Sequence, residues 1–401
     1  MPLAVTISPG TFLVIVACSA LAGTIATLAA ARGLTLPVVV VELLLGIAIG
    51  PQAIGLHPTE FISFFSDLGL GLLFFFAGYE IDLDRIRGAP LELAIAGWAM
   101  SLAIAYGLGA ALAAAGVVLS LLYTGSAMAT TALGTLLPAL SDAGELRTRF
   151  GAFLMAAGAV GEFGPILLLT LILSAQGTVH NALILVAFIG LAVSVALFAV
   201  RSAARTLPLM ARTMEASAQL AVRWIVVLVF ALALLAFELG LDLLLGGFAA
   251  GLITRQMLSR RELPGFDSKL TAVAFGVFVP FFFVVSGMKV DIDALFASPS
   301  GVLKMLLFFV LFLVVRGAPA MLLYRRVMDE RERIALALLC STQLPLVVAI
   351  TTLAVEDHHM RASTAAALVG AAVLSTLVFP AIGLRLRGHS TEKSAVALAE
   401  A

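Results

Sequence analysis

The chain has 401 residues, of which 62% are hydrophobic and only 12% are charged, and its mean hydropathy is +1.12. A soluble protein carries roughly a quarter charged residues, so this composition excludes a soluble globular protein and indicates a polytopic membrane protein. The 24 basic and 24 acidic residues leave no net charge and therefore no basic surface for nucleic acid, and two cysteines are too few for a disulfide framework or a thiolate metal site.

Apolar stretches that could cross a bilayer follow one another along the whole chain. With about 20 apolar residues needed for each helix, the sequence predicts thirteen spans. They cover residues 11–31, 36–55, 61–78, 91–112, 117–140, 150–174, 182–200, 220–237, 239–255, 270–288, 302–324, 334–355 and 363–384. The polar segments between them are short, so we expect a single membrane domain over residues 1–400, without a soluble regulatory domain, an enzyme active site or a cofactor.

The positions of the basic residues predict the orientation in the membrane. With the N-terminus outside, 20 of the 24 Lys and Arg fall on the inner side, three (Lys289, Lys304 and Arg361) fall outside, and Arg316 lies within a span. Basic residues are enriched in cytoplasmic loops. We therefore predict an external N-terminus and a cytoplasmic C-terminus.

Two parts of the chain repeat the same pattern. The second span contains Glu42-Leu-Leu-Leu-Gly and the ninth contains Asp242-Leu-Leu-Leu-Gly, and the next span in each case carries three successive phenylalanines before a glycine. An offset of seven spans, which is odd, makes the repeats cross the membrane in opposite directions, so the acidic residues that follow them fall on opposite sides: Asp82 and Asp84 inside, Asp291 and Asp293 outside. Inverted repeats are typical of alternating-access secondary transporters, although chance similarity between Leu- and Gly-rich helices is the alternative.

Two charged residues lie too deep in predicted spans to reach an interface. Glu162 is at the centre of the sixth span, between Gly161 and the helix-loosening Gly164-Pro165 pair. A carboxylate at this depth either binds a proton or coordinates a hard cation through its oxygens, whereas the structural alternative is a protonated acid bonded to a neighbouring helix. Arg316, in the eleventh span, is either part of a structural ion pair or a direct participant in transport.

Polar stretches interrupt the fifth and twelfth spans, which are also seven spans apart. Pro345 removes a helix hydrogen bond in the twelfth span, and broken helices at membrane depth occur only where they line a cavity or lie inside protein. The neutral candidates for ion binding, as ligands or as wall groups, come from these two stretches: Thr130, Thr131, Ser341, Thr342 and Gln343. The alternative is a pair of kinked helices whose hydroxyls bond their own backbone.

Three motifs in order resemble those of the sodium/proton exchanger domain of monovalent cation/proton antiporters, particularly the bacterial branch that includes the potassium-efflux transporters. They are Leu36-Pro37 followed by Glu42-Leu-Leu-Leu-Gly46 and Gly50-Pro51, the run from Leu68 to Asp82, and Pro280-Phe-Phe-Phe-Val-Val-Ser-Gly287-Met. The resemblance implies an all-α inner-membrane antiporter that exchanges Na⁺ or K⁺ for H⁺. It also implies a homodimer of thirteen-span protomers with inverted repeats and two crossed, broken helices.

The resemblance further implies a division into two parts and a role for each deep charge. A dimerisation part would take about residues 11–78 and 220–288, and a core part that moves as an elevator would take about 91–174 and 302–384. The ion-binding acid of the family falls on Glu162, which would hold the monovalent cation, and its core basic residue falls on Arg316. The chain has Gly161 where the family commonly has Asp, Asn or Gln. We also expect it to be without the nucleotide-binding domain of the potassium-efflux branch.

Because a single carboxylate is neutralised equally by one proton or one monovalent cation, we expect electroneutral exchange of one for one. Two other functions stay open from the sequence. One is an organic-anion symporter on a related inverted-repeat fold, with Arg316 binding the substrate, and the other is a transport-inactive membrane sensor.

Overall fold

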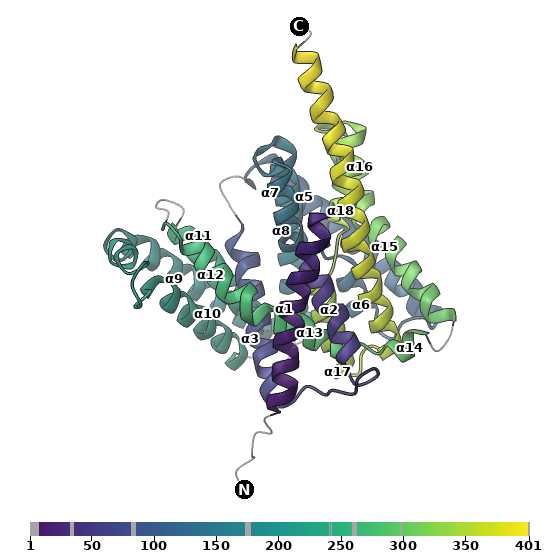
Figure 1. Ribbon diagram of the computed structural model, residues 1–401. Coiled ribbons are helices and arrows are strands. Elements are labelled where there is room, and N and C mark those ends of the chain that lie inside the picture. The colour runs from purple at the N-terminus through teal and green to yellow at the C-terminus, as the bar shows by residue number, and fades with distance from the viewer. Residues whose placement is uncertain are drawn as a thin grey trace. The chain divides into compact units, whose positions relative to one another are not determined.

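A computed structural model describes residues 8–32, 36–81, 86–172, 178–239, 241, 243–258, 263–296 and 299–399, and every regular element within these ranges is a helix (Figure 1). Ten of the helical segments are long and apolar enough to cross a membrane. They are α1 (Pro9–Ala31), α3 (Glu60–Tyr79), α5 (Ala89–Ala114), α8 (Arg149–Ile172), α9 (Thr178–Arg212), α10 (Leu220–Glu238), α12 to α13 (Phe266–Lys289), α15 (Pro299–Leu323), α16 to α17 (Glu330–Glu356) and α18 (Ala362–Ala399).

Shorter helices lie where the other three spans were expected. Two of them, α2 (Val38–Ile49) and α11 (Leu243–Leu258), are apolar helices of fewer than 18 residues. The predicted span 117–140 consists of two pieces, α6 (Leu121–Met128) and α7 (Leu133–Asp142). The all-helical membrane fold with broken helices is confirmed, while the count of thirteen crossings stays a prediction.

The chain forms two compact units, and the first comprises Met1–Ala22, Leu56–Asp82 and Ile166–Met288. Gly246, the glycine of the second repeat, and Gly251 lie where α11 packs tightly against its neighbours. A Cβ at Gly251 would meet the carbonyl of Phe75 in α3, and a Cβ at Gly246 would meet the backbone of Ala233 in α10. Small residues that let helix backbones approach closely are characteristic of packing within membranes. In the same unit, α12 (Phe266–Val273) passes through a π-helical turn, Ala274–Phe278, into α13 (Val279–Lys289).

The second unit comprises Gly23–Gly55, Leu83–Pro165 and Lys289–Ala401. Within it α15 packs against α5, α16 (Glu330–Cys340) and α18, and α17 (Pro345–Glu356) packs against α6 and α18. The short α14 (Ile292–Phe296) contacts α15 and α18. The described part of this unit also contains two 3₁₀ turns, Glu145–Arg147 between α7 and α8 and Tyr324–Arg326 after α15.

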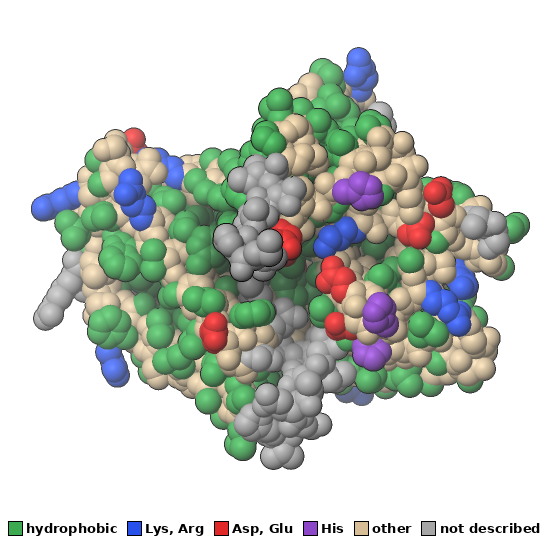
Figure 2. All heavy atoms as spheres, turned by 90° about the horizontal axis from the view of Figure 1, so that it is seen from below, with side chains coloured by type: hydrophobic (Ala, Val, Ile, Leu, Met, Phe, Trp, Pro, Cys, Tyr) green, Lys and Arg blue, Asp and Glu red, His purple; other side chains and the backbone are tan. Residues whose placement is uncertain are grey.

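Polar links join helix ends of the second unit. At one end of the molecule the Tyr123 hydroxyl lies 3.3 Å from an Asp357 carboxylate oxygen, and Lys289 lies 3.1 Å from Glu356. Acidic, basic and histidine side chains gather on the face seen in Figure 2. Elsewhere in the unit, Arg387 of α18 makes two bonds of 3.0 and 3.1 Å to Glu145 and one of 2.9 Å to Glu332 of α16.

Parts of the sequence-based interpretation fall outside this description. Asp82, Asp84 and Asp242, which belong to the predicted repeats, lie outside the described residues. Helix α2, which the sequence-based division assigned to the dimerisation part, belongs to the second compact unit. The roles of the two units as dimerisation and core parts stay a proposal.

Candidate ion-binding site

The first break, between α6 and α7, leaves Ala129–Ala132 without helical structure. No proline lies in this stretch. The Thr130 hydroxyl donates to the carbonyl of Ala127 at 3.0 Å, and the Thr131 amide donates to the Gly161 carbonyl of α8 at 3.1 Å. The stretch thus finds hydrogen-bond partners outside its own helix, as buried backbone in a membrane requires.

The second break, between α16 and α17, follows from Pro345 at the start of α17. Proline has no amide proton and disfavours helical backbone in the residue before it, and Leu344 accordingly has φ −158° and ψ −64°. The Gln343 amide donates to the Ser375 hydroxyl at 3.0 Å, and the Gln343 carbonyl accepts from Ser375 and Thr376, both at 3.1 Å. Hydrogen bonds from α18 therefore satisfy the backbone groups of Gln343 at this break.

The two breaks cross and bond to each other. The Ala132 amide donates to the Thr342 carbonyl at 2.8 Å, and the Thr131 hydroxyl donates to the Cys340 carbonyl at 2.6 Å. The Gln343 side chain completes the link, with Nε2 3.0 Å from the Met128 carbonyl and Oε1 3.1 Å from the Thr130 hydroxyl. All of these polar side chains are buried. The predicted crossed, broken helices are thereby observed.

Glu162 lies beside this crossing and is only 6% exposed. The backbone N–H of Leu133, the first residue of α7, is directed at its carboxylate. A helix N-terminus carries partial positive charge and stabilises a negative group there. Next to Glu162 on α8, Gly164 leaves room for the indole of Trp98, whose Nε1 donates to the Ala129 carbonyl at 3.2 Å.

Arg316 reaches the crossing from α15 and is 4% exposed. Its Nε donates to the Thr131 hydroxyl at 2.9 Å, its Nη1 to the Ser101 hydroxyl at 3.2 Å and its Nη2 to the Ala157 carbonyl at 3.1 Å. The Cys340 carbonyl is a further, longer acceptor at 3.5 Å. Among the described residues, no carboxylate lies within 4.0 Å of this guanidinium, so the ion pair that the sequence allowed for Arg316 stays a prediction.

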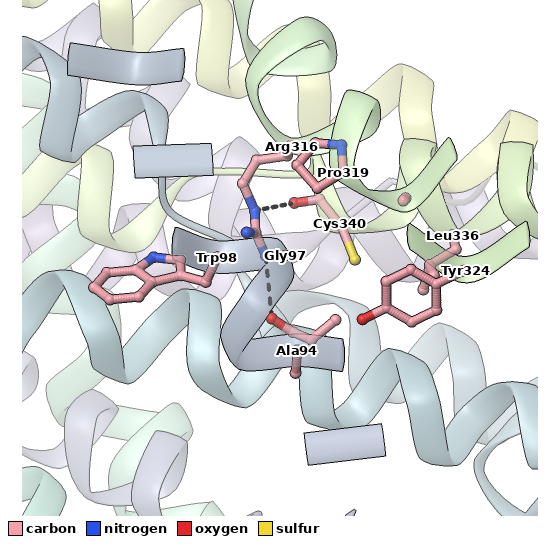
Figure 3. Close-up of a pocket in the computed structure, with 10 residues that line it drawn as sticks. Ala94, Gly97, Trp98, Arg316, Pro319, Tyr324, Leu336 and Cys340 are labelled. Carbon is pink, nitrogen blue, oxygen red and sulfur yellow. Dashed lines mark hydrogen bonds between the residues drawn. The ribbon is translucent and has the colours of Figure 1, made fainter. Parts of the chain in front are cut away.

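A small pocket opens beside the guanidinium, as Figure 3 shows. Cys340 and Tyr324 lie on one side of Arg316 in this view, and Trp98 lies on the other. The rest of the lining is apolar or glycine and comes from α5, α8, α15 and α16. The guanidinium is the charged group of a pocket that is otherwise made of weakly polar and apolar side chains.

The predicted neutral residues divide into two groups. Thr130, Thr131 and Gln343 make bonds across the crossing. Ser341 and Thr342 bond the carbonyls of Ala337 and Leu338 in their own helix, at 2.6 and 3.4 Å, which is the alternative that the sequence left open. Sequence reasoning missed Ser101, although it is a polar residue within an apolar stretch of α5, and it missed the Leu133 amide, which carries no sequence signal.

A buried carboxylate beside two crossed, broken helices defines a class of membrane protein, because secondary transporters build their ion sites from interrupted helices at the membrane centre. The profile of the transmembrane sodium/hydrogen exchanger family matches residues 17–384, and the chain belongs to this family. The resemblance inferred from the sequence motifs is thus confirmed.

Similar proteins place the chain among cation/proton antiporters. The Na⁺/H⁺-K⁺ antiporter GerN of Bacillus cereus is 27% identical over 65% of this chain and 67% of its own length, and the Na⁺/H⁺ antiporter of Enterococcus hirae is 26% identical over 65% and 68%. YjbQ of Bacillus subtilis is 25% identical over 86% of this chain, but the match spans only 58% of YjbQ. These relatives indicate transport rather than enzyme catalysis.

The fold has a counterpart among solved structures. The sodium proton antiporter MjNhaP1 from Methanocaldococcus jannaschii matches with a TM-score of 0.65 and 18% sequence identity, over 95% of this chain and 97% of MjNhaP1. At this identity the match establishes the fold alone. Together with the family profile, it confirms a membrane protein of the antiporter fold.

Proposed function

We propose that this protein exchanges a monovalent cation, Na⁺ or K⁺, for protons, with Glu162 as the group that carries either one. The observation that supports this proposal best is the burial of Glu162 beside the crossed breaks. An ionised carboxylate is costly in a membrane interior, so the site favours states in which a proton or a cation neutralises it. Each occupant excludes the other, and that competition couples the two flows.

The exchange is electroneutral in this proposal. Either one proton or one monovalent cation cancels the charge of Glu162, and position 161 holds a glycine instead of a second acid. Arg316 cannot supply a second proton, because a guanidinium does not deprotonate in proteins. The occupied site therefore has the same net charge with a proton as with a cation, and one exchange cycle moves no net charge across the membrane.

The movement that changes access is an elevator motion of the core within a homodimer in the bacterial inner membrane, with the N-terminus outside. Residues of the candidate site, from Ser101 to Gln343, all belong to the second compact unit, which supports transport with the site intact. The first unit would then provide the dimer contact.

The test uses purified protein in liposomes. Protons are followed with an internal dye after addition of Na⁺ or K⁺, and then, with Na⁺ as the test ion, under a voltage clamped by valinomycin and K⁺. Wild-type protein should exchange at a rate independent of voltage. Glu162→Gln keeps the shape of the side chain but cannot ionise, so exchange should disappear, while the matched control Glu92→Gln, at an exposed carboxylate of α5, should retain it.

Each other outcome points to a different conclusion. Exchange that survives in Glu162→Gln would move the site elsewhere, and a rate that follows the voltage would contradict electroneutrality. Uptake of an organic anion without cation exchange would favour the symporter, and no flux of any kind would favour the sensor.

A further inference from the structure

The guanidinium of Arg316 has more hydrogen-bond donors than the described residues accept. A guanidinium carries one N–H on Nε and two on each Nη atom. Nε donates to Thr131 and, at longer range, to the Cys340 carbonyl, whereas Nη1 donates only to Ser101 and Nη2 only to the Ala157 carbonyl within the described part of the chain. One N–H on each Nη atom is therefore left over. The side chain is 4% exposed, so its charge is buried with neither a carboxylate nor bulk water beside it.

The small pocket beside this guanidinium presents further donor groups (Figure 3). Tyr324 and Cys340 line it together with Arg316, and both lie within electrostatic reach of the guanidinium. The Tyr324 hydroxyl points toward the side of the pocket where Arg316 lies. Neither this hydroxyl, on a side chain that is 2% exposed, nor the Cys340 thiol bonds another described residue. The groups available to a ligand are thus N–H, O–H and S–H groups in otherwise apolar surroundings.

The dimensions and position of the pocket suit a small ion. Its space admits about one water-sized particle. Tyr324 lies at the end of α15, and the next two residues, Arg325 and Arg326, are exposed. A positive potential around the entrance to a site raises the local concentration of anions. The arginines therefore favour the approach of an anion to the Tyr324 side of the pocket.

We propose that this pocket binds a single monovalent inorganic anion of halide size, such as chloride. The leftover N–H groups of Arg316 and the Tyr324 hydroxyl donate to the anion, and its charge neutralises the guanidinium. Hydrogen bonds between charged groups are short and strong, and a buried charge without an opposite charge is costly. The anion thus stabilises the folded protein. A water molecule is the competing occupant, but it would leave the charge of Arg316 unbalanced.

Thermal unfolding of the purified protein in detergent tests the site without any transport. Protein purified without chloride is titrated with N-methyl-D-glucamine chloride against N-methyl-D-glucamine gluconate at constant ionic strength. The large cation keeps Na⁺ and K⁺ away from Glu162, and gluconate is too large for the pocket. Tm should rise with chloride and level off after about 2 °C or more, because the anion binds the folded state.

Two variants assign this effect to the pocket. Arg316→Gln should abolish the chloride dependence of Tm, while Arg361→Gln, whose arginine bonds the Gly116 carbonyl, should retain it. Tyr324→Phe keeps the ring contact with Phe153 and removes one donor, so the chloride concentration at half the Tm rise should increase by about tenfold.

The matched control for Tyr324→Phe is Tyr106→Phe. The Tyr106 hydroxyl lies 3.1 Å from the Ser126 hydroxyl and does not line the pocket, so this change should leave the chloride titration as in the wild type. If Arg316→Gln does not fold, the two tyrosine variants decide the matter.

A Tm that is the same in chloride and gluconate would overturn the proposal in favour of water. Equal chloride titrations for Tyr324→Phe and Tyr106→Phe would overturn it in favour of binding elsewhere on the protein. Crystals grown in bromide should show an anomalous peak between Arg316 and Tyr324, and an empty or water-filled pocket there would also contradict it. Because none of these measurements involves exchange, they stand whether or not Glu162 carries the transported ions.

Discussion

The two helix breaks look alike in the fold but have different origins. The break between α16 and α17 has a local cause in Pro345, which removes one amide and prevents the preceding residue from continuing the helix. The break at Ala129–Ala132 contains no proline, and its polar groups bond mainly to other elements: to Cys340, Thr342 and Gly161. Only the second break thus has a signal in its own sequence, whereas both breaks are held by hydrogen bonds to other elements.

Gln343 should have the largest effect on this arrangement, because it belongs to one break and holds the other. Gln343→Leu keeps the volume but leaves the Met128 carbonyl buried without its donor and removes a partner of Thr130. A buried polar group without a partner costs about 1–3 kcal/mol, and we expect a loss of about 3 kcal/mol in the free energy of unfolding. Denaturant unfolding in detergent measures it. A loss below about 0.5 kcal/mol, typical of surface changes, would contradict the role of Gln343.

Thr131→Val should have an intermediate effect. Valine has the same shape but cannot donate to the Cys340 carbonyl or accept from Arg316. We expect a loss of about 1–2 kcal/mol from these two bonds. The control is Thr135→Val, because among the described residues the Thr135 hydroxyl bonds the carbonyl of Ala132, within its own segment. Similar losses for the two variants would mean that the bonds across the crossing do not contribute to the free energy of unfolding.

Pro345→Ala should have the smallest effect, although proline starts the second break. The Gln343 amide and carbonyl remain bonded to Ser375 and Thr376, and the Ala132 amide remains bonded to Thr342. We expect a change below about 1 kcal/mol, chiefly from the greater freedom of the unfolded chain. A loss above about 2 kcal/mol in the same unfolding measurement would show that proline itself maintains the break.

The sequence predicted features that have a local physical signal. Glu162 and Arg316 were found because charges inside apolar runs are rare and costly, and the second break was found from Pro345. The membrane class, the helical fold and the family followed from composition and from motifs in order. The roles of Glu162 and Arg316 in transport stay predictions.

Contacts between distant parts of the chain could not be predicted. Nothing in the sequence near Ser101 or Ala157 indicates that both bond Arg316. The close approach of Arg316 to Gly161 has no sequence signal either, because the two residues lie 155 positions apart. The two hydroxyls of Ser341 and Thr342 were expected near the ion, but a nearby carbonyl in their own helix competes for each of them.

Hydrogen bonds and ion pairs join the crossed helices at their outer ends as well as at the crossing. Tyr123 of α6 bonds Asp357 just after α17, and Arg387 joins the turn before α8 to the first turn of α16. If the four half-helices rotated apart about the crossing, these bonds at the helix ends would break together with the bonds at the crossing. In the proposed elevator motion, a displacement that keeps all of these bonds would carry α6, α7, α16 and α17 as one block, and the contacts that change would lie on the outer surfaces of that block rather than at the proposed ion site.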